Sequence, residues 1–425
     1  MLDLKFIREN PDIVKKSIKN RGLTLDIDEL LAIDSKRREI LMEMEELRHK
    51  KNIISQEIGK KIAQKGDVNQ EKSEIKTISQ KIDEIEPKVE DLDIKLSNLL
   101  LLVPNIPHNS VPIGADPQAN KIVREWGEGP KFKFEPRSHI ELADILDIID
   151  FKRASKIVGS FFILYKGLGA RLERALINFM LDLHTKRHGY KEIFPPFLVN
   201  RKSMTGTGQL PKLEEDMYCL RDDDYFLIPT AEVPVTNLHR DEVIPEEKLP
   251  IYYTAYTACF RREAGSYGKD TKGLTRVHQF DKVELVKFVK PETSYDELES
   301  LLKDAEEVIR LLRLPYRVSL LSTEGISFAA SKCYDIELLA AASKVYLEVS
   351  SCSNFEDFQA RRANIRYKEK NSQRVLYVHT LNGSGVATAR LLIALIENYQ
   401  TKNGTVIIPK ILRPYMDGIK EIKPT

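Results

Sequence analysis

The sequence is poor in cysteine and has no long hydrophobic run. Its 425 residues include four cysteines, and no two of them form a Cys-x-x-Cys pair. They are Cys219, Cys259, Cys333 and Cys352. This scatter argues against a disulfide framework and against a zinc ribbon. The longest uninterrupted apolar run, residues 391–396, is far shorter than the ~20 residues that a transmembrane helix needs.

The sequence also lacks an excess of either charge. Its 66 Lys and Arg residues against 64 Asp and Glu residues leave a net charge of +2. A uniformly basic nucleic-acid coat is therefore excluded, although a local basic patch is not. The first ten residues carry charges throughout and have no apolar centre, unlike a signal peptide. We therefore expect a soluble cytoplasmic protein with no membrane partner.

A long helical segment is present near the N-terminus. The length predicts about three domains at ~150 residues each, and residues 24–102 differ in composition from the remainder. Apolar residues there recur at alternating spacings of three and four. The first series is Leu30, Ile33, Arg37, Ile40, Met44, Leu47, Lys51, Ile54 and Ile58, of which all but Arg37 and Lys51 are apolar. The second is Ile75, Ile78, Ile82, Ile85, Val89, Leu92, Leu96 and Leu99. A repeat of 3.5 residues predicts two helices packed as a coiled coil.

The break at residues 66–69 is short, which favours an antiparallel hairpin. Residues 48–65, which lead to the turn, contain six Lys and Arg residues against Glu57 alone, whereas residues 82–93 are strongly acidic. A basic tip on a long rod could bind phosphates. The alternative is an ordinary solvated face of a coiled coil, which the spacing alone favours.

A proline-rich linker follows the hairpin, with four prolines between residues 104 and 117. Beyond it, helical patterns at 170–187, 294–312 and 387–402 alternate with strand-like runs at 251–260, 277–289 and 345–350. This order predicts an α+β fold, with an antiparallel sheet flanked by helices. We therefore divide the chain into an arm domain at 1–103, a linker at 104–120 and a globular domain at 121–425.

The most informative segment for chemistry runs from residue 258 to residue 284. A strand ends in Arg261, Arg262 and Glu263, a loop rich in Gly and Lys follows, and a second strand carries Glu284. An arginine on a rigid strand suits a bidentate clamp on a phosphate or a carboxylate. A surface hairpin with ordinary charge pairing is an equally weighted alternative from the residues alone.

This segment resembles motif 2 of class II aminoacyl-tRNA synthetases, and in detail that of the seryl-tRNA synthetases. Further matching segments span nearly the whole chain in the same order. They are Thr205-Gly-Thr-Gly-Gln-Leu-Pro-Lys212, Thr230-Ala-Glu232, Phe260-Arg-Arg-Glu-Ala-Gly-Ser-Tyr-Gly268, His278-Gln-Phe-Asp-Lys-Val-Glu284, Glu348-Val-Ser-Ser-Cys-Ser-Asn354, Phe358-Gln-Ala-Arg-Arg362 and Leu381-Asn-Gly-Ser-Gly385 with Arg390. The N-terminal hairpin is similar to the tRNA-binding arm of that family. One motif alone is weak evidence, but the ordered set is specific.

The resemblance implies a serine–tRNA ligase that uses ATP and Mg²⁺. Such an enzyme joins serine to AMP and then transfers the seryl group to the 3′ end of tRNA(Ser), with tRNA(Sec) as a further expected acceptor. Motif 1 is looser: the helix at 170–187 and the segment 189–196 resemble the dimer-forming elements, which implies a homodimer. Two alternatives remain open, an amino acid:carrier-protein ligase and an inactive RNA-binding paralogue. Carrier-protein ligases of this kind lack a long arm, so residues 24–102 argue against the first alternative. Retention of the charged motif residues argues against an inactive paralogue.

The resemblance also implies roles for individual residues. The catalytic pair is Arg261 and Arg390, at the α-phosphate and the far end of the triphosphate. The expected serine-binding residues are Thr230, Ala231, Glu232, Arg261, Glu284, Asn382 and Ser384. The expected ATP-binding residues are Arg261, Arg262, Glu263, Val277, Glu348, Val349, Ser350, Ser351 and Arg390. The expected Mg²⁺ ligands are Glu348 and Ser351, whose oxygens suit a hard cation.

Two features depart from the family pattern. Arg262 is bulkier than the small residue often found at its position. Residues 337–344 lack the tryptophan and proline expected after Asp-Ile-Glu, which puts the conformation of the turn before Glu348 in doubt.

Overall fold

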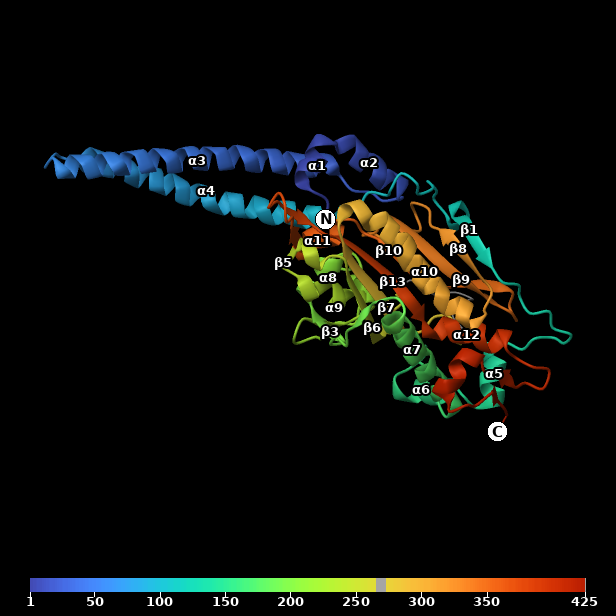
Figure 1. Cartoon of the computed structure of the whole chain (residues 1–425). Coiled ribbons are helices and arrows are strands. Elements are labelled where there is room, and N and C mark those ends of the chain that lie inside the picture. Colours follow the sequence, from blue (N-terminus) through green and yellow to red (C-terminus); the bar gives the residue numbers. More distant parts are fainter. Residues whose placement is uncertain (265–272, 425) are drawn as a thin grey trace. The chain divides into compact units, whose positions relative to one another are not determined.

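The computed structural model describes residues 1–264 and 273–424. Its internal contacts divide the chain into two compact units (Figure 1). The arm unit comprises Leu2–Lys19 and Leu23–Pro104. The core unit comprises Met1, Asn20–Gly22 and the described residues from Asn105 onward. In the part of the chain that is described, no helix combines the length and the apolar character needed to cross a membrane.

The arm unit is helical. Its helices are α1 (Leu4–Glu9), α2 (Pro11–Asn20), α3 (Ile27–Ala63) and α4 (Asn69–Leu102). The Asp26 carboxylate caps α3 by accepting hydrogen bonds from the backbone N–H groups of Asp28 and Glu29, and Lys60 and Lys61 lie in the last turn. Both features complement the helix dipole. At ~1.5 Å per residue, the 37 residues of α3 span ~55 Å.

The helices α3 and α4 form the predicted antiparallel hairpin. Ion pairs join Arg37 to Asp93, Arg48 to Glu86 and Lys61 to Glu71. As the residue number increases along α3, that of its partner on α4 decreases, so the two helices run antiparallel. The two predicted apolar series meet in the seam: Met44 packs with Ile85 and Val89, and Ile54 packs with Ile78 and Ile82. The coiled-coil prediction is therefore confirmed.

The end of α4 differs from the predicted seam by one residue. Leu100 is buried, whereas the predicted Leu99 is only partly covered. An α-helix turns every 3.6 residues, so a strict 3.5-residue series drifts off the contact line after several turns. Pro87 lies within α4 on its exposed side, where water can solvate the carbonyl that the proline leaves without a partner.

The core unit is built on an eight-stranded, mostly antiparallel sheet within the described residues, in the order β1-β8-β9-β10-β13-β7-β6-β2. The strands are β1 (Lys121–Trp126), β2 (Lys191–Glu192), β6 (Ile251–Phe260), β7 (Gln279–Val289), β8 (Tyr316–Leu320), β9 (Lys332–Ala340), β10 (Val345–Asn354) and β13 (His379–Ala387). The short β2 pairs with β6 in parallel, and the other neighbours are antiparallel. The α+β prediction is confirmed.

Three long helices pack against this sheet (Figure 1) and bury the main apolar core with it. They are α7 (Leu168–Lys186), α10 (Ser294–Leu312) and α12 (Thr388–Asn398). The shorter helices are α5 (His139–Leu146), α6 (Phe151–Ile157), α8 (Arg201–Thr207), α9 (Glu232–Thr236) and α11 (Phe358–Ala363). The 3₁₀ turns are η1 (Pro117–Ala119), η2 (Glu214–Asp216), η3 (Asn237–His239), η4 (Glu246–Lys248), η5 (Pro291–Thr293) and η6 (Lys410–Met416).

Short strands complete the core unit at its margins. They are β3 (Leu198–Asn200), β4 (Tyr225–Leu227), β5 (Val243–Pro245), β11 (Arg366–Lys368), β12 (Val375–Tyr377), β14 (Val406–Ile407) and β15 (Glu421–Ile422). Of the predicted elements, 251–260 and 294–312 match β6 and α10 at both ends, whereas α12 stops four residues before the predicted 402. The loop predicted between β6 and β7 falls largely on residues 265–272, which lie outside the described residues.

Candidate active site

A cavity of about 470 Å³ opens between the middle strands of the sheet and the segments that cover them. Most of the predicted site residues line it. They are Thr230, Glu232, Arg261, Glu263, Val277, Glu284, Glu348, Val349, Ser351, Asn382, Ser384 and Arg390. These residues come from distant parts of the chain, and the pairing of β6, β7, β13 and β10 brings them together.

Strand β7 supplies three functional side chains to the cavity, of which we predicted only Glu284. Phe280, Lys282 and Glu284 alternate along the strand and all line the cavity. Alternate residues of a strand share one face, so counting back by two from Glu284 would have identified Phe280 and Lys282. Lys282 Nζ lies 2.5 Å from the Glu284 carboxylate and donates a hydrogen bond of 2.8 Å to Thr230 Oγ1.

Glu232 is the second acid of this pocket, and it is held in place by Gln359. The Gln359 amide donates hydrogen bonds to Glu232 Oε1 at 2.6 Å and to the Thr207 carbonyl at 3.1 Å. Its own oxygen accepts a hydrogen bond of 2.7 Å from Thr380 Oγ1. Gln359 stands in a segment that we had matched by motif, but its role in orienting Glu232 was not predicted.

Burial raises the pKa of Glu232 to about 7, and the nearby Glu284 carboxylate adds to this rise. Hydrogen bonds from Gln359 and Asn382, and the positive charge of Lys282, act in the opposite direction. Two buried carboxylates around one lysine form a strongly polar pocket, and such groups must be paired if they are not to cost stability. The pocket therefore suits a small ligand that carries an ammonium and further hydrogen-bond donors.

Arg261 leaves the end of β6 and faces the same cavity. Its guanidinium lies 5.2 Å from the centre of the Phe280 ring, and its Nε donates to the Pro229 carbonyl at 3.3 Å. A guanidinium that lines the cavity in this way suits a ligand with a phosphate or a carboxylate. Nearby, Glu263 pairs with Arg276 at 2.9 Å and links the two ends of the segment between β6 and β7.

Arg390 approaches the cavity from the first turn of α12. Its Nε donates to the Thr275 carbonyl at 3.0 Å, and its Nη1 donates to the Glu348 carbonyl at 2.9 Å. The guanidinium is thereby fixed between β10 and the segment that precedes β7. Arg261 and Arg390 give the cavity two fixed cations, an arrangement that suits a ligand with several phosphates.

Glu348 and Ser351 lie on the same side of β10 because of a bulge. A spacing of three places two residues of a regular strand on opposite faces, but the register of β10 shifts between Glu348 and Ser350. Ser351 Oγ donates to Asp335 at 2.6 Å, which leaves its lone pairs available. The Glu348 side chain is 50% exposed, so its carboxylate is accessible from the cavity.

These oxygens fit a divalent cation that is shared with a ligand. A buried Asp335 behind Ser351 orients the hydroxyl, as second-sphere groups do in metal sites. Across the residues that the structure describes, no cluster of three or more His, Cys, Asp or Glu side chains forms a complete metal cage. A cation here would take its other ligands from phosphate oxygens and water, as Mg²⁺ commonly does.

Three predicted site residues do not line the cavity among the described residues. Ala231 is fully buried in a separate apolar cluster. Arg262 is fixed at its backbone, where its N–H donates to the Asp216 carbonyl at 2.9 Å. Ser350 points to the opposite side of β10 and donates to the Ser384 carbonyl at 2.6 Å. Ala231 and Ser350 can therefore act on a ligand only through the backbone or through a neighbour, whereas the Arg262 side chain is exposed.

The antiparallel sheet, the arginine at the end of β6 and the arginine on the helix after β13 define a class II aminoacyl-tRNA synthetase. The family model of the tRNA synthetase class II core domain (G, H, P, S and T) matches residues 216–399. The model of the seryl-tRNA synthetase N-terminal domain matches residues 1–107.

Within this class, the chain belongs to the seryl-tRNA synthetase family. It is 59% identical to the serine–tRNA ligase of Caldanaerobacter subterraneus subsp. tengcongensis, over 98% of each chain. The crystal structure of seryl-tRNA synthetase from Pyrococcus horikoshii complexed with ATP is similar, with a TM-score of 0.93, 38% identity and full coverage of both chains. The cytoplasmic serine–tRNA ligase from Naegleria fowleri in complex with AMP aligns with a TM-score of 0.88 and 29% identity, over 100% of this chain and 99% of that one.

Proposed function

We propose that this protein is a serine–tRNA ligase, which activates L-serine with ATP and esterifies the 3′ end of tRNA(Ser). The observation that carries the proposal is a single cavity that is acidic at one end and basic at the other. One end holds the buried acids Glu232 and Glu284 around Lys282, and the other holds the fixed cations Arg261 and Arg390. An amino acid and a triphosphate can therefore lie in contact, as adenylate formation requires.

In the first step, a serine carboxylate oxygen attacks the α-phosphorus of ATP, and the bond from that phosphorus to the bridging oxygen of pyrophosphate breaks. Arg261 would hold the serine carboxylate and the α-phosphate together. Arg390 would bind the far end of the triphosphate, and Phe280 offers a flat apolar surface for the adenine. Both arginines stabilise negative charge in the transition state because they are already fixed by carbonyl contacts.

The acid pocket would select the amino acid. The serine ammonium and hydroxyl are hydrogen-bond donors that match the Glu232 and Glu284 carboxylates, and Thr230, Asn382 and Ser384 border the same space. Alanine lacks the hydroxyl, so its binding would leave a buried acceptor unpaired. Glu348 and Ser351 would hold Mg²⁺, which when bound neutralises charge on the departing pyrophosphate.

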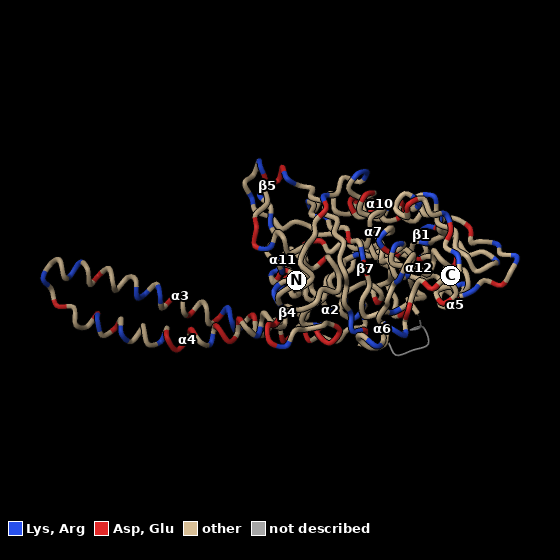
Figure 2. The backbone as a smooth tube through the Cα atoms, turned by 90° about the horizontal axis from the view of Figure 1, so that it is seen from below, with Lys and Arg blue, Asp and Glu red and all other residues tan. Residues whose placement is uncertain are grey.

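In the second step, a hydroxyl of the terminal tRNA adenosine attacks the seryl carbonyl and AMP leaves. We propose that residues 1–103 form the tRNA-binding domain, joined by residues 104–120 to the catalytic domain at 121–425. Supporting this, Lys50, Lys60 and Lys65 on the arm are exposed and make no ion pair among the described residues. Figure 2 shows the Lys and Arg positions along the tube of α3. We propose that tRNA(Sec) is a second acceptor and binds to the same domain.

We also propose a homodimer through the segment 189–196 and the neighbouring edge of the core unit. The apolar face of α7 does not support the dimer, because Leu172, Leu176 and Phe179 pack inside the core unit itself. Support comes instead from Phe194, whose large apolar side chain is 74% exposed in the single chain. The Phe197 ring lies 5.9 Å from that of Phe194, and apolar side chains that gather in a patch mark interaction surfaces.

The decisive experiment is ATP–pyrophosphate exchange with each amino acid in turn. We expect exchange with serine, and at least 100-fold weaker exchange with alanine and glycine, since a site built for a hydroxyl rejects analogues that lack it. Exchange with another amino acid, followed by transfer to a carrier protein and not to tRNA, would establish the alternative ligase. The absence of exchange with any amino acid would favour an inactive RNA-binding protein.

A further inference from the structure

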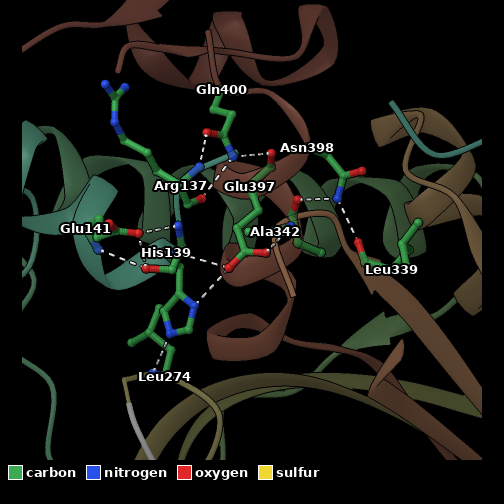
Figure 3. Close-up of polar contacts among 11 residues, drawn as sticks. Arg137, His139, Glu141, Leu274, Leu339, Ala342, Glu397, Asn398 and Gln400 are labelled. Carbon is green, nitrogen blue, oxygen red and sulfur yellow. Dashed lines mark hydrogen bonds and ion pairs between the residues drawn. The ribbon is translucent and has the colours of Figure 1, made fainter. Parts of the chain in front are cut away.

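A buried hydrogen-bonded cluster lies next to the cavity and contains residues that the proposed reaction does not use. Its centre is Glu397, on α12 and 2% exposed. Glu397 Oε1 accepts hydrogen bonds from the backbone N–H of His139 at 2.9 Å and from His139 Nδ1 at 3.0 Å. Its other oxygen accepts the Ala342 N–H at 3.0 Å. The carboxylate is therefore fully engaged, and every partner donates to it (Figure 3).

This arrangement determines which His139 nitrogen carries a proton. Because the Glu397 carboxylate can only accept, His139 Nδ1 must donate to it. The backbone N–H of Leu274 points to the other ring nitrogen, Nε2, at 3.3 Å, so Nε2 must accept. His139 is thus the neutral tautomer with its proton on Nδ1, and it bridges α12 to the segment that leads into β7 (Figure 3).

The backbone around His139 is fixed independently. The Arg137 N–H donates to Gln400 Oε1 at 2.8 Å, and Gln400 Nε2 donates back to the Arg137 carbonyl at 3.0 Å. Ser138 and Glu141 form a capping box at the start of α5. The imidazole is therefore presented in one orientation, by a helix whose start is attached to the end of α12.

The segment that His139 contacts belongs to the cavity. Residues 274–277 all line it, and the Thr275 carbonyl accepts the Nε hydrogen bond of Arg390. Gly273 lies against the imidazole so closely that a Cβ atom there would be 2.2 Å from His139 Nε2. Arg390 and Glu397 are seven residues apart, or two turns of α12, so one face of this helix holds the segment directly through Arg390 and indirectly through Glu397 and His139.

We propose that His139, held by Glu397, is a positioning residue for ATP: it fixes residues 273–277 so that the wall of the cavity beside Arg390 and Glu263 keeps its shape. The inference rests on the proposed function. It predicts that loss of the contact between His139 and Leu274 impairs ATP binding and adenylate formation, while serine binding, at Glu232 and Glu284, changes little.

Two substitutions of His139 separate this role from a merely structural one. In His139→Asn, the amide can still donate to Glu397, as Nδ1 does, but it cannot reach the Leu274 N–H. In His139→Gln, the amide oxygen can replace Nε2 as the acceptor for Leu274, while the bond to Glu397 is weakened. We expect His139→Asn to raise the KM for ATP in exchange by roughly 5- to 100-fold, because a buried N–H loses its acceptor. The KM for serine should stay within about twofold of the wild-type value, and His139→Gln should restore most of the ATP affinity.

Gly273→Ala tests the same contact from the other side, without altering His139 or Glu397. The added Cβ and the positive φ of +71° should displace the segment from His139 and cause the same ATP-selective loss. The double variant His139→Asn with Gly273→Ala should lose no more than the worse single variant, because both break one contact. His49→Asn, on the exposed surface of the arm, is the matched control.

Equal losses for ATP and serine, or equal losses in the Asn and Gln variants, would overturn the proposal and leave His139 a structural residue. Wild-type kinetics in both His139→Asn and Gly273→Ala would overturn it as well. The rise in melting temperature on adding ATP is measured for each protein in parallel. If the wild type shows this rise but no serine-dependent exchange, the proposed function fails while the positioning role is still tested by ATP alone.

Discussion

At the residue scale, the ion pair of Lys282 and Glu284 occupies the centre of the acid pocket. Glu284 is 2% exposed on its side chain and Lys282 is 7% exposed, so neither charge is satisfied by bulk water. Removing one member of such a buried pair typically costs ~2–5 kcal/mol, in part because the other charge remains unpaired. Serine binding would depend on the same carboxylate.

We predict that Glu284→Gln lowers kcat/KM for serine in ATP–pyrophosphate exchange by roughly 30- to 5,000-fold, the equivalent of ~2–5 kcal/mol. The KM for ATP should change by less than about threefold, because Arg261 and Arg390 are unaltered. Glu247→Gln, an exposed glutamate in η4, serves as the control. Serine activation at wild-type efficiency in Glu284→Gln would mean that the amino acid binds elsewhere.

The raised pKa of Glu232 leads to a pH dependence. Its pKa is about 7, above the ordinary value of 4.5, so the side chain is neutral below this pH and ionised above it. Only the carboxylate attracts the serine ammonium. We therefore expect kcat/KM for serine to rise between pH 6 and pH 8 with an inflection near 7, a value that reports the free enzyme.

The control for this pH profile is Glu232→Gln, which should be weaker overall and should lack that inflection. A flat serine profile in the wild type between pH 6 and pH 8 would show that Glu232 does not contact the ammonium.

The same shift affects folding stability. Between about pH 4.5 and pH 7 the folded protein holds a proton on Glu232 that the unfolded chain releases, so stability from this group is present at low pH and falls as pH rises through the window. The ionised Glu232 thus lowers the free energy of unfolding, but its carboxylate is needed for binding. Such a compromise between stability and activity is common.

At the scale of elements, the arm hairpin has a seam of its own. Met44, Ile85 and Val89 pack together within it, next to Ile40, Leu41 and Leu47. Across the hairpin, Arg48 and Lys61 are neutralised by Glu86 and Glu71. The six basic residues predicted as the tip are therefore not all available, and the exposed lysines at 50, 60 and 65 are the stronger candidates for phosphate contacts.

We predict a split result when residues 30–99 are replaced by a short Gly-Ser linker. Serine-dependent exchange should persist, because the cavity is built entirely from core-unit residues, while most tRNA charging should be lost. Charging assays and exchange assays on the same preparation test this. If tRNA charging were undiminished, the arm would not be needed for tRNA binding. If exchange were lost, the arm would be needed for the activity of the core unit.

A milder variant tests the charge itself. Replacing Lys50, Lys60 and Lys65 by Gln should weaken tRNA binding and reduce the slope of log K against log salt by up to about 3, one for each lost phosphate contact. The matched control replaces the exposed acids Glu84 and Glu90 by Gln, and should not weaken binding.

At the scale of the whole molecule, the proposed dimer follows from exposed apolar surface. Phe194 is the most exposed large apolar side chain in the described part of the chain. We predict that sedimentation at micromolar concentration finds a species of twice 48.8 kDa, and that Phe194→Glu shifts it to the monomer. Ile113→Glu, also at an exposed apolar residue, should leave the dimer intact. A wild-type protein that sediments only as a monomer would contradict the interface.

Much of the architecture was predictable because local periodicity carries it. The coiled-coil seam was read from alternating spacings of three and four, and β6 and α10 were located to the residue. Helix and strand periods depend only on neighbouring residues, so one sequence is enough to reveal them. The family is likewise recognisable from the ordered motifs, which include Arg261, Glu284 and Arg390.

The tertiary structure alone decided how these residues cooperate. The bulge in β10 brings Glu348 and Ser351 to one side, although their spacing predicts opposite faces. Packing also decides that Ser350 and Ala231 do not line the cavity. His139 and Glu397 are 258 residues apart and belong to no motif that we recognised. Their contact depends on which helix ends the sheet packing brings together, and that long-range information is absent from any local pattern.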